Sequence, residues 1–176
     1  MSSAVESVAT LHGAEITLIA DAMAAVDTRE AVLSAVEHIA VARMGVTVFS
    51  ASVCFLETME LERVYSSRPD VYPTGGRKSK RETSWGQQVM RDRQVFVGEG
   101  PLEMAAAFDD QERMASVGIR SIINVPIVVH DRCLAVLNFG RNAERILPGE
   151  VVIARFLGLV AAPVFVTGPA IADPTG

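Results

Sequence analysis

Residues 119–140 of this chain read IRSIINVPIVVHDRCLAVLNFG. Two apolar runs rich in valine and isoleucine are separated by His130-Asp131-Arg132, a composition typical of two strands joined by a tight turn. Nearly every position in both runs is apolar, rather than every second one, so both faces of this hairpin are expected to be covered. The sequence therefore predicts that the hairpin lies in the middle of a sheet.

Length and composition limit the class of protein. The chain has 176 residues, which suits a single domain with a substantial core. It is 49% hydrophobic and 21% charged, as is ordinary for a soluble globular protein. A net charge of −5 argues against a nucleic-acid partner, which would require a basic face. Neither a signal peptide nor a membrane-spanning segment is expected, and no membrane partner is predicted.

The N-terminal part is predicted to be helical. Apolar residues recur every three or four positions between about residues 3 and 26, which indicates an amphipathic helix. Asp27, with Glu30 three residues later, restarts a helix that runs to about Arg43. Because the apolar stripe in residues 1–26 is narrow and has no evident partner, we expect this N-terminal helix to mediate dimerisation. The alternative is that it folds back onto its own domain.

The rest of the chain alternates between strands and less regular segments. Residues 67–83 contain two prolines, two glycines and a run of charge, and are expected to form a long loop. The tail, residues 168–176, is rich in proline and glycine and is expected to be disordered. Further strands are predicted over residues 46–58, 61–66 and 94–98, and helices over residues 84–93, 101–107, 109–117 and 149–162. This order predicts an α+β fold in which an antiparallel sheet of five to six strands has helices packed on one face and long cross-connections over the other.

Two stretches carry a resemblance to a known family. Residues 84–97, SWGQQVMRDRQVFV, resemble the helix and short strand of the GAF domain family, the small-molecule sensor fold related to PAS. Residues 118–139, GIRSIINVPIVVHDRCLAVLNF, are similar to the hairpin of that family, with Pro126 at the expected place. The resemblance implies a GAF/PAS-like antiparallel sheet and a GAF domain at residues 27–167.

The resemblance also implies a ligand pocket between the sheet and the cross-connections at residues 66–84 and 99–118. Members of the family bind cyclic nucleotides, tetrapyrroles, small metabolites or no ligand. Here Asn138 is followed by Phe139 and the later acidic position reads Gly149-Glu150, which departs from the cyclic-nucleotide-binding branch. The cross-connections contain no cysteine of the kind that the methionine-sulfoxide-reducing branch uses or that holds a bilin. The ligand and any cofactor therefore stay unidentified.

Aromatic and polar residues around the long loop are candidates for lining such a pocket. Tyr65, Ser67, Tyr72 and Trp85 combine aromatic walls with a few polar groups, as a small-ligand site requires. The alternative is that Tyr72 and Trp85 simply close the domain as core residues.

Asn124 interrupts an apolar strand, where a buried amide must find hydrogen-bond partners. Either it bonds to loop backbone or it faces a ligand, and we expect it on the same face of the sheet as Ile122.

One basic cluster, RKSKR at residues 77–81, stands out in an acidic protein. Arg77 and Lys78 are candidates for attracting a carboxylate or phosphate of a ligand. The alternative is a solvated loop tip, because exposed charges usually pair weakly. The three histidines show no metal-ligand spacing, and neither a metal site nor a catalytic residue is assigned.

The two cysteines, Cys54 and Cys133, are too few for a disulfide framework and fit a reducing cytoplasm. If their strands are antiparallel neighbours, the two thiols would approach each other. A redox pair is one interpretation, and packed free cysteines are the other.

Together these patterns predict a cytoplasmic, homodimeric sensory module that binds a small molecule, has no catalytic activity of its own and acts through a separate effector protein. One alternative is a small thiol-based redox enzyme of the free methionine sulfoxide reductase type. Another is a pure dimerisation scaffold with a filled pocket.

Overall fold

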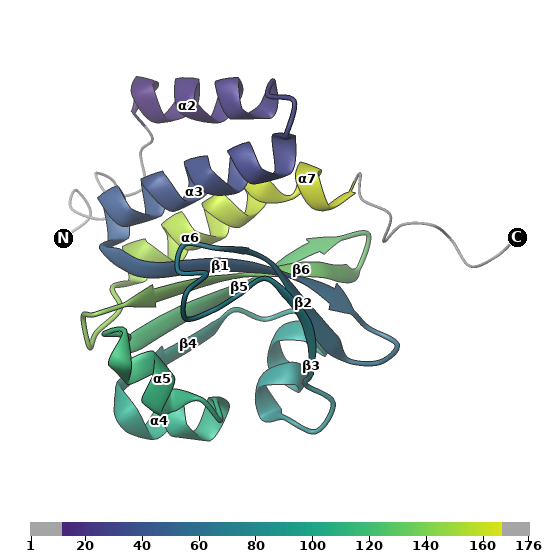
Figure 1. Cartoon of the computed structure of the whole chain (residues 1–176), viewed down its shortest axis with the longest axis vertical. Coiled ribbons are helices and arrows are strands. Elements are labelled where there is room, and N and C mark those ends of the chain that lie inside the picture. Colours follow the sequence, from purple (N-terminus) through teal and green to yellow (C-terminus); the bar gives the residue numbers. More distant parts are fainter. Residues whose placement is uncertain (1–11, 167–176) are drawn as a thin grey trace, which may run out of the picture.

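A six-stranded antiparallel sheet forms the centre of the molecule (Figure 1). The computed structural model describes residues 12–166. The strands within them are β1 (Val46–Phe55), β2 (Glu60–Ser66), β3 (Gly75–Ser79), β4 (Phe96–Glu99), β5 (Ser121–Val129) and β6 (Arg132–Arg141). Their order across the sheet is β3-β2-β1-β6-β5-β4, and every neighbouring pair is antiparallel.

Helices cover one face of this sheet and irregular connections cover the other. The first side holds α2 (Gly13–Met23), α3 (Thr28–Met44), α6 (Pro148–Ala161) and α7 (Pro163–Val166). The second side holds the π-helical turn η1 (Gly86–Arg91), α4 (Gly100–Ala107) and α5 (Gln111–Ser116). In Figure 1 the layers run from α2 through α3 and α6 to the sheet, and then to the connections. The α+β architecture predicted from the sequence is therefore confirmed.

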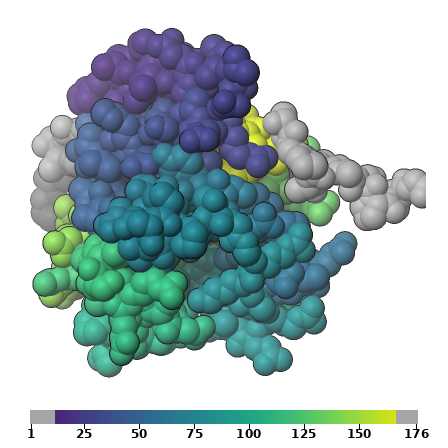
Figure 2. All heavy atoms as spheres, in the orientation of Figure 1, coloured from purple at the N-terminus to yellow at the C-terminus, as the bar shows by residue number. Residues whose placement is uncertain are grey.

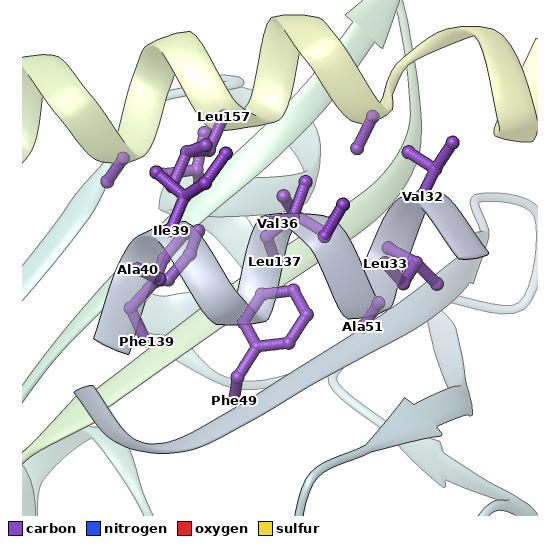
Figure 3. Close-up of a cluster of buried hydrophobic side chains, with 14 of the residues drawn as sticks. Val32, Leu33, Val36, Ile39, Ala40, Phe49, Ala51, Leu137, Phe139 and Leu157 are labelled. Carbon is purple, nitrogen blue, oxygen red and sulfur yellow. The ribbon is translucent and has the colours of Figure 1, made fainter. Parts of the chain in front are cut away.

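The main hydrophobic core lies between α3, α6 and the sheet (Figure 3). Val36 and Ile39 of α3 meet Phe49 of β1 and Leu157 of α6, and all four side chains are fully buried. Their spacing explains the helix, because residues three or four apart share one helix face. Burying side chains of this size contributes roughly 1.5–3 kcal/mol each. This layer fixes the sheet and leaves its other face free for a different role.

The hairpin of residues 119–140 lies inside the sheet, as predicted. Both β5 and β6 have a strand on either side, so neither is an edge strand. The two turn residues, His130 and Asp131, have φ angles of 46° and 63°, which is the left-handed pair that a tight two-residue hairpin requires. The His-Asp-Arg break thus marks the turn.

The structure differs from the sequence predictions in two places. The loop predicted over residues 67–83 contains β3, an exposed edge strand paired with β2. Its sequence, GGRKS, lacks the β-branched and aromatic residues that signal a strand, and backbone pairing with β2 supplies the order instead.

The second difference concerns the N-terminal helix, whose residues 3–11 lie outside the described residues, as does the tail at 168–176. α2 packs on α3 of its own chain, which is the alternative that the sequence left open (Figure 1). Glu15 of α2 forms an ion pair with Arg43 of α3 at 3.4 Å. The premise that this helix lacks a partner in its own chain was therefore wrong.

Candidate functional site

A cavity of about 290 Å³ lies between the second face of the sheet and the connections that cross it. Its walls come from β1, β2 and β6, from β3 and the residues around it, and from the α4–α5 segment. In Figure 2 the teal atoms of the β3 region and the green atoms of α4 and α5 flank an indentation on this face. A space of this size is at the lower end of ligand pockets and suits a small metabolite.

The cavity exists because the two faces of the central strands carry different side chains. On the helical face β1 and β6 place Phe49, Leu137 and Phe139, which are fully buried. On the opposite face the same strands place the small or polar residues Ser50, Ser52, Asn138 and Gly140 among the lining residues. Since successive side chains of a strand alternate between faces, one short sequence both fills the core and leaves room opposite it. The floor of the cavity is therefore small and polar.

The lining of the cavity is strongly basic in an acidic protein. It contains five cationic residues and a single carboxylate, Asp110. The cations are Arg63, Arg77, Lys78, Lys80 and Arg113. Arg77 is already neutralised by Glu60 and Glu62 of β2, at 3.8 Å and 3.4 Å, and Lys78 lies 4.0 Å from Asp109. Arg113 of α5 is exposed. The cations of the interior of the cavity are consequently Arg63 and Lys80.

Lys80 is a buried cation without a counter-ion in contact. Only 6% of the residue is exposed, and no carboxylate of the described residues lies within ion-pair distance of its ammonium. Nζ lies instead 5.2 Å from the ring centre of Trp85 and 5.8 Å from that of Phe108. Burial lowers the pKa of the Lys80 ammonium, with Lys78 adding to the effect, while Asp109 and Asp110 oppose it.

Arg63 and Tyr72 bury polar atoms that have no hydrogen-bond partner. Among the described residues, neither Nε of Arg63 nor the hydroxyl of Tyr72 is bonded. The Arg63 guanidinium lies 5.0 Å from the ring centre of Tyr72, and its Nη1 donates to the carbonyl of Pro73 at 3.3 Å. Burial lowers the pKa of Arg63 and raises that of Tyr72 to about 12. Unbonded buried donors are uncommon in folded proteins, and each costs about 1–3 kcal/mol.

A chain of hydrogen bonds joins Trp85 to the floor of the cavity. The indole Nε1 donates to Oδ1 of Asn124 at 2.9 Å, and Nδ2 of Asn124 donates to Oδ1 of Asn138 at 2.7 Å. Nδ2 of Asn138 then donates to Oγ of Ser50 at 3.2 Å. These bonds hold Trp85 rigidly across the end of the cavity, immediately before η1.

The residues proposed from the sequence fall into two groups. Tyr72, Trp85, Arg77 and Lys78 line the cavity. Asn124 lies on the predicted face but is fully buried, where it bonds to the side chains of Trp85 and Asn138. It therefore positions the lining rather than forming it.

Tyr65 and Ser67 lie elsewhere. The Tyr65 hydroxyl donates to Glu37 of α3 at 2.7 Å, which places this side chain on the helical face, and burial raises its pKa to about 12. Oγ of Ser67 accepts from the backbone N–H of Phe49 at 2.9 Å and so extends the pairing at the end of β2. The β-bulge at Val64 shifts the strand register, which explains why counting along the strand does not reveal this change of face.

Arg63 was not predicted from the sequence, and Lys80 was not singled out from its basic cluster. Lys80 belongs to the basic cluster at 77–81, but its burial depends on contacts with Trp85 and Phe108, which are distant in sequence. Arg63 follows Leu61 by two positions in β2, and both line the cavity. That alternation was the one signal that could have identified Arg63.

A second depression, of about 1020 Å³, lies where the α2–α3 junction, the end of β2 and α7 meet. It includes Tyr65, yet its lining contains no buried polar atom without a partner among the described residues. It is the larger of the two spaces, but the smaller cavity is the better candidate site because it combines aromatic walls with unsatisfied donors.

Cys54 and Cys133 do approach each other, as the strand order suggested. Their sulfur atoms lie 3.6 Å apart as free thiols, and both residues are buried. The β-bulge between Val128 and Ile127 brings Cys133 to the same side of the sheet as Cys54. The contact with Cys133, followed by burial, raises the pKa of Cys54 well above its usual value. Neither thiol lines the cavity.

Residues 12–166 contain neither a metal site nor a membrane-spanning helix. No group of three or more His, Cys, Asp and Glu side chains is arranged to hold a metal ion there. No helix in the same range has the length and apolar character needed to cross a bilayer.

The fold and the cavity define a small α+β domain whose antiparallel sheet has helices on one face and a cavity on the other. The family model for the GAF domain matches residues 5–163, which is most of the chain. The chain therefore belongs to the GAF domain family. No curated protein is significantly similar to the sequence.

Solved structures of GAF domains share the fold at low sequence identity. The GAF domain of a phosphoenolpyruvate-protein phosphotransferase from Coxiella burnetii superimposes with a TM-score of 0.68 at 15% identity, covering 85% of this chain and 89% of that one. The GAF domain of a two-component sensor histidine kinase from Bacillus halodurans gives 0.54 at 15% identity, covering 76% and 96%.

A third neighbour is an enzyme. The free methionine-R-sulfoxide reductase from Neisseria meningitidis, in complex with its substrate, gives a TM-score of 0.60 at 13% identity, covering 86% of this chain and 85% of that one. At these identities the comparisons show a shared fold, and function must be derived from the site.

Proposed function

We propose that this protein is a sensory module that binds a small molecule in the 290 Å³ cavity and has no catalytic activity of its own. The observation that carries the proposal is the pair of unbonded donors on Arg63 and Tyr72, beside the unpaired ammonium of Lys80. A folded protein rarely retains such groups unless another molecule satisfies them. The general role of GAF domains as regulatory modules supports the same conclusion.

Ligand binding would shift the equilibrium between two conformations of the protein, which differ in the segments that roof the cavity. The segments that roof the cavity, around β3 and across α4 and α5, are short elements with many exposed residues, whereas the central strands β1 and β6 beneath them are mostly buried. A ligand that contacts both floor and roof favours the closed arrangement by its differential affinity for the two. The helical layer on the other face would carry the change to a separate effector protein.

We also propose that the module works as a homodimer in the cytoplasm. The outer face of α6 exposes Val152, Phe156 and Leu159, four and three residues apart and therefore on one side of the helix. An exposed apolar stripe of this kind favours association with a second copy. Sedimentation velocity at micromolar concentration should show a dimer. A monomer under those conditions would contradict this part of the proposal.

The rival function is a thiol-based redox enzyme, which the 3.6 Å approach of Cys54 and Cys133 favours. The raised pKa of Cys54 opposes it, since the reactive species is the thiolate. Replacing both cysteines with serine separates the two functions. A sensor retains its ligand-induced stabilisation in the double variant, whereas a thiol enzyme loses turnover.

The direct test of the sensory function is a thermal-shift screen of the wild-type protein. Cyclic nucleotides, amino acids, purines, hydantoin-like metabolites and small carboxylates form the panel. A compound present at 100 times its Kd stabilises the folded state by about 2.7 kcal/mol. If no compound in the panel raises Tm, the protein is better described as a scaffold with an unused cavity.

A cavity-filling variant links any stabilisation to this site. Ser52 lines the cavity and is 5% exposed, so Ser52→Leu should abolish the ligand-induced shift in Tm while the protein stays folded. Thr58→Leu, in the exposed turn after β1, places the same side chain outside the cavity and is the control. Equal shifts in both variants would place the binding site elsewhere.

A further inference from the structure

The charges that line the cavity favour a ligand of negative charge. Arg63, Lys80 and Tyr72 all interact electrostatically with Asp110, the single carboxylate of the lining. No ion pair joins Asp110 to Arg63 or Lys80 within the described residues. The three donors thus line the same cavity, and one carboxylate influences each of them.

Two of these donors have no hydrogen-bond acceptor within the described residues. The Tyr72 hydroxyl and Nε of Arg63 each have a hydrogen to donate and no acceptor among residues 12–166. Tyr72 and Lys80 are both 6% exposed, so water is largely excluded from them. The Lys80 ammonium lies over the faces of two aromatic rings and forms no ion pair within residues 12–166. A group with several negatively charged oxygen atoms would complement these residues, which line one cavity.

We propose that the ligand of this cavity is a small organic anion, whose carboxylate or phosphate group binds between Arg63, Tyr72 and Lys80. The inference rests on the proposed function of the cavity and specifies the chemistry of its occupant. Charge-assisted hydrogen bonds of this kind are about twice as strong as neutral ones, and exclusion of water strengthens them further.

The remainder of the ligand is apolar. The cavity is also walled by Val48, Met114, Ile119 and Ile122, which belong to one buried hydrophobic cluster, and by Phe108, whose ring lies against Lys80. Such a wall binds a hydrocarbon or aromatic body and does not recognise further charge. A carboxylate or phosphate with an apolar body therefore matches both ends of the site.

The variants that test this inference change charge at single positions. Lys80→Met and Arg63→Met remove a cation and keep an apolar stem of similar length. Arg81→Met removes the neighbouring exposed cation, which does not line the cavity, and is the matched control. Asp110→Asn removes the lone carboxylate but leaves a residue that is equally suited to begin α5, so the fold is preserved.

The organic probes share a phenyl ring and differ in the polar or charged group that it carries. Benzoate and phenyl phosphate carry the two anionic groups, benzamide replaces the carboxylate with a neutral amide, and phenylalanine adds an ammonium group. Inorganic phosphate tests the anionic group alone. Trp85 is the single tryptophan of the chain and lies 5.2 Å from Lys80 Nζ, so its fluorescence reports binding at this position directly.

We expect benzoate or phenyl phosphate to change Trp85 fluorescence and to raise Tm, with benzamide binding at least tenfold more weakly. Lys80→Met and Arg63→Met should each weaken anion binding by roughly ten- to a hundredfold, the range for hydrogen bonds to charged groups. Arg81→Met should leave Kd within about twofold, and Asp110→Asn should tighten binding because a repelling charge is gone. Circular dichroism establishes that each variant is folded.

Three results would overturn the inference. Equal affinity for benzamide and benzoate would leave the cavity as a ligand site but not as an anion site. Loss of affinity in Asp110→Asn together with preference for phenylalanine would assign the site to zwitterions. Binding of neither anion to the wild-type protein at millimolar concentration would reject the anion class, and the wider thermal-shift panel then judges the proposed function separately.

Discussion

Lys80 is a charged residue that the folded protein keeps almost entirely out of water. Removing an ammonium from water costs several kcal/mol, while contacts with two aromatic faces recover only about 1–2 kcal/mol. The 6% exposure of Lys80 is thus a cost to the free protein, and function offers a reason for it.

Replacing Lys80 with methionine should therefore stabilise the protein in the absence of ligand. The side chain keeps its packing against Trp85 and Phe108 and loses the buried charge. We expect the free energy of unfolding to rise by about 1–2 kcal/mol and Tm to rise by roughly 2–6 °C. Thermal unfolding measures both. A destabilised Lys80→Met protein would mean that this residue has a structural role.

The pH dependence of stability should differ between the wild-type protein and Lys80→Met. The pKa of Lys80 is lower in the folded state than the ordinary value of 10.5, so over the intervening pH range the unfolded chain holds a proton that the folded chain has released. Stability rises with pH wherever the unfolded state binds more protons. The wild-type protein should gain stability relative to the variant as pH increases toward 10.5. Parallel curves from denaturant unfolding at several pH values would contradict the burial of this charge.

The position of η1 depends on one close contact, between Gly86 and the backbone of Lys80. A Cβ added to Gly86 would lie 2.1 Å from the backbone carbonyl oxygen of Lys80, and the Gly86 N–H donates to Oγ1 of Thr83 at 2.9 Å. Only glycine lets the start of η1 pack against the segment that carries Lys80. The position of the ammonium in the cavity thus depends on a residue that does not touch the ligand.

Gly86→Ala should destabilise the protein by about 2–3 kcal/mol, because backbone must move to relieve the overlap. Urea unfolding monitored by circular dichroism measures this change. Gly13→Ala is the matched control, since a Cβ at that helical position meets nothing within 4 Å, and its stability should be unchanged or up to about 1 kcal/mol higher. Similar losses in both variants would argue against the close approach at η1.

A buried ion pair joins β6 to α6. Arg141 contacts the two carboxylate oxygens of Glu150 at 2.6 Å and 2.8 Å, and its Nε donates to the carbonyl of Met44 at the end of α3. Glu150 also accepts from the backbone N–H of Leu147 at the start of α6. The Gly149-Glu150 pair departs from the cyclic-nucleotide-binding branch, and its glutamate stabilises the packing of α6 on the helical face.

Removing one partner leaves the other charge buried and unpaired. Glu150→Ala should lower the free energy of unfolding by about 3–5 kcal/mol. Glu144→Ala, in the exposed pair with Arg120, should change it by no more than about 0.5 kcal/mol. Chemical denaturation of both variants provides the comparison, and a loss below 1 kcal/mol in Glu150→Ala would show that the pair is not excluded from water.

The helices and the hairpin were predictable because local sequence determines them. Helical periodicity and the His130-Asp131 turn appear directly in the residues. β3 was not predictable in this way, because its order comes from pairing with β2 rather than from its own composition. The faces of Tyr65 and Cys133 depend on β-bulges, which shift the alternation of a strand without an obvious signal in the sequence.

Across the whole molecule, the two faces of one sheet perform separate tasks. The helical face is filled by large apolar side chains, and the opposite face carries Ser50, Ser52 and Asn138 beneath a basic roof. The family resemblance predicted where the cavity lies, and the sequence predicted two of its three aromatic lining residues, Tyr72 and Trp85, but not Phe108. The burial of Arg63 and Lys80 could not be predicted from the sequence, because it arises from contacts between segments distant in the chain.

A crystal of the protein soaked with bromobenzoate tests the central claim most directly, because anomalous scattering locates the bromine without ambiguity. A peak inside the 290 Å³ cavity, with the carboxylate within hydrogen-bond distance of Arg63, Tyr72 or Lys80, is the predicted result. An α4–α5 segment packed into that space, with no bromine between it and the sheet, would contradict the existence of a ligand site on this face.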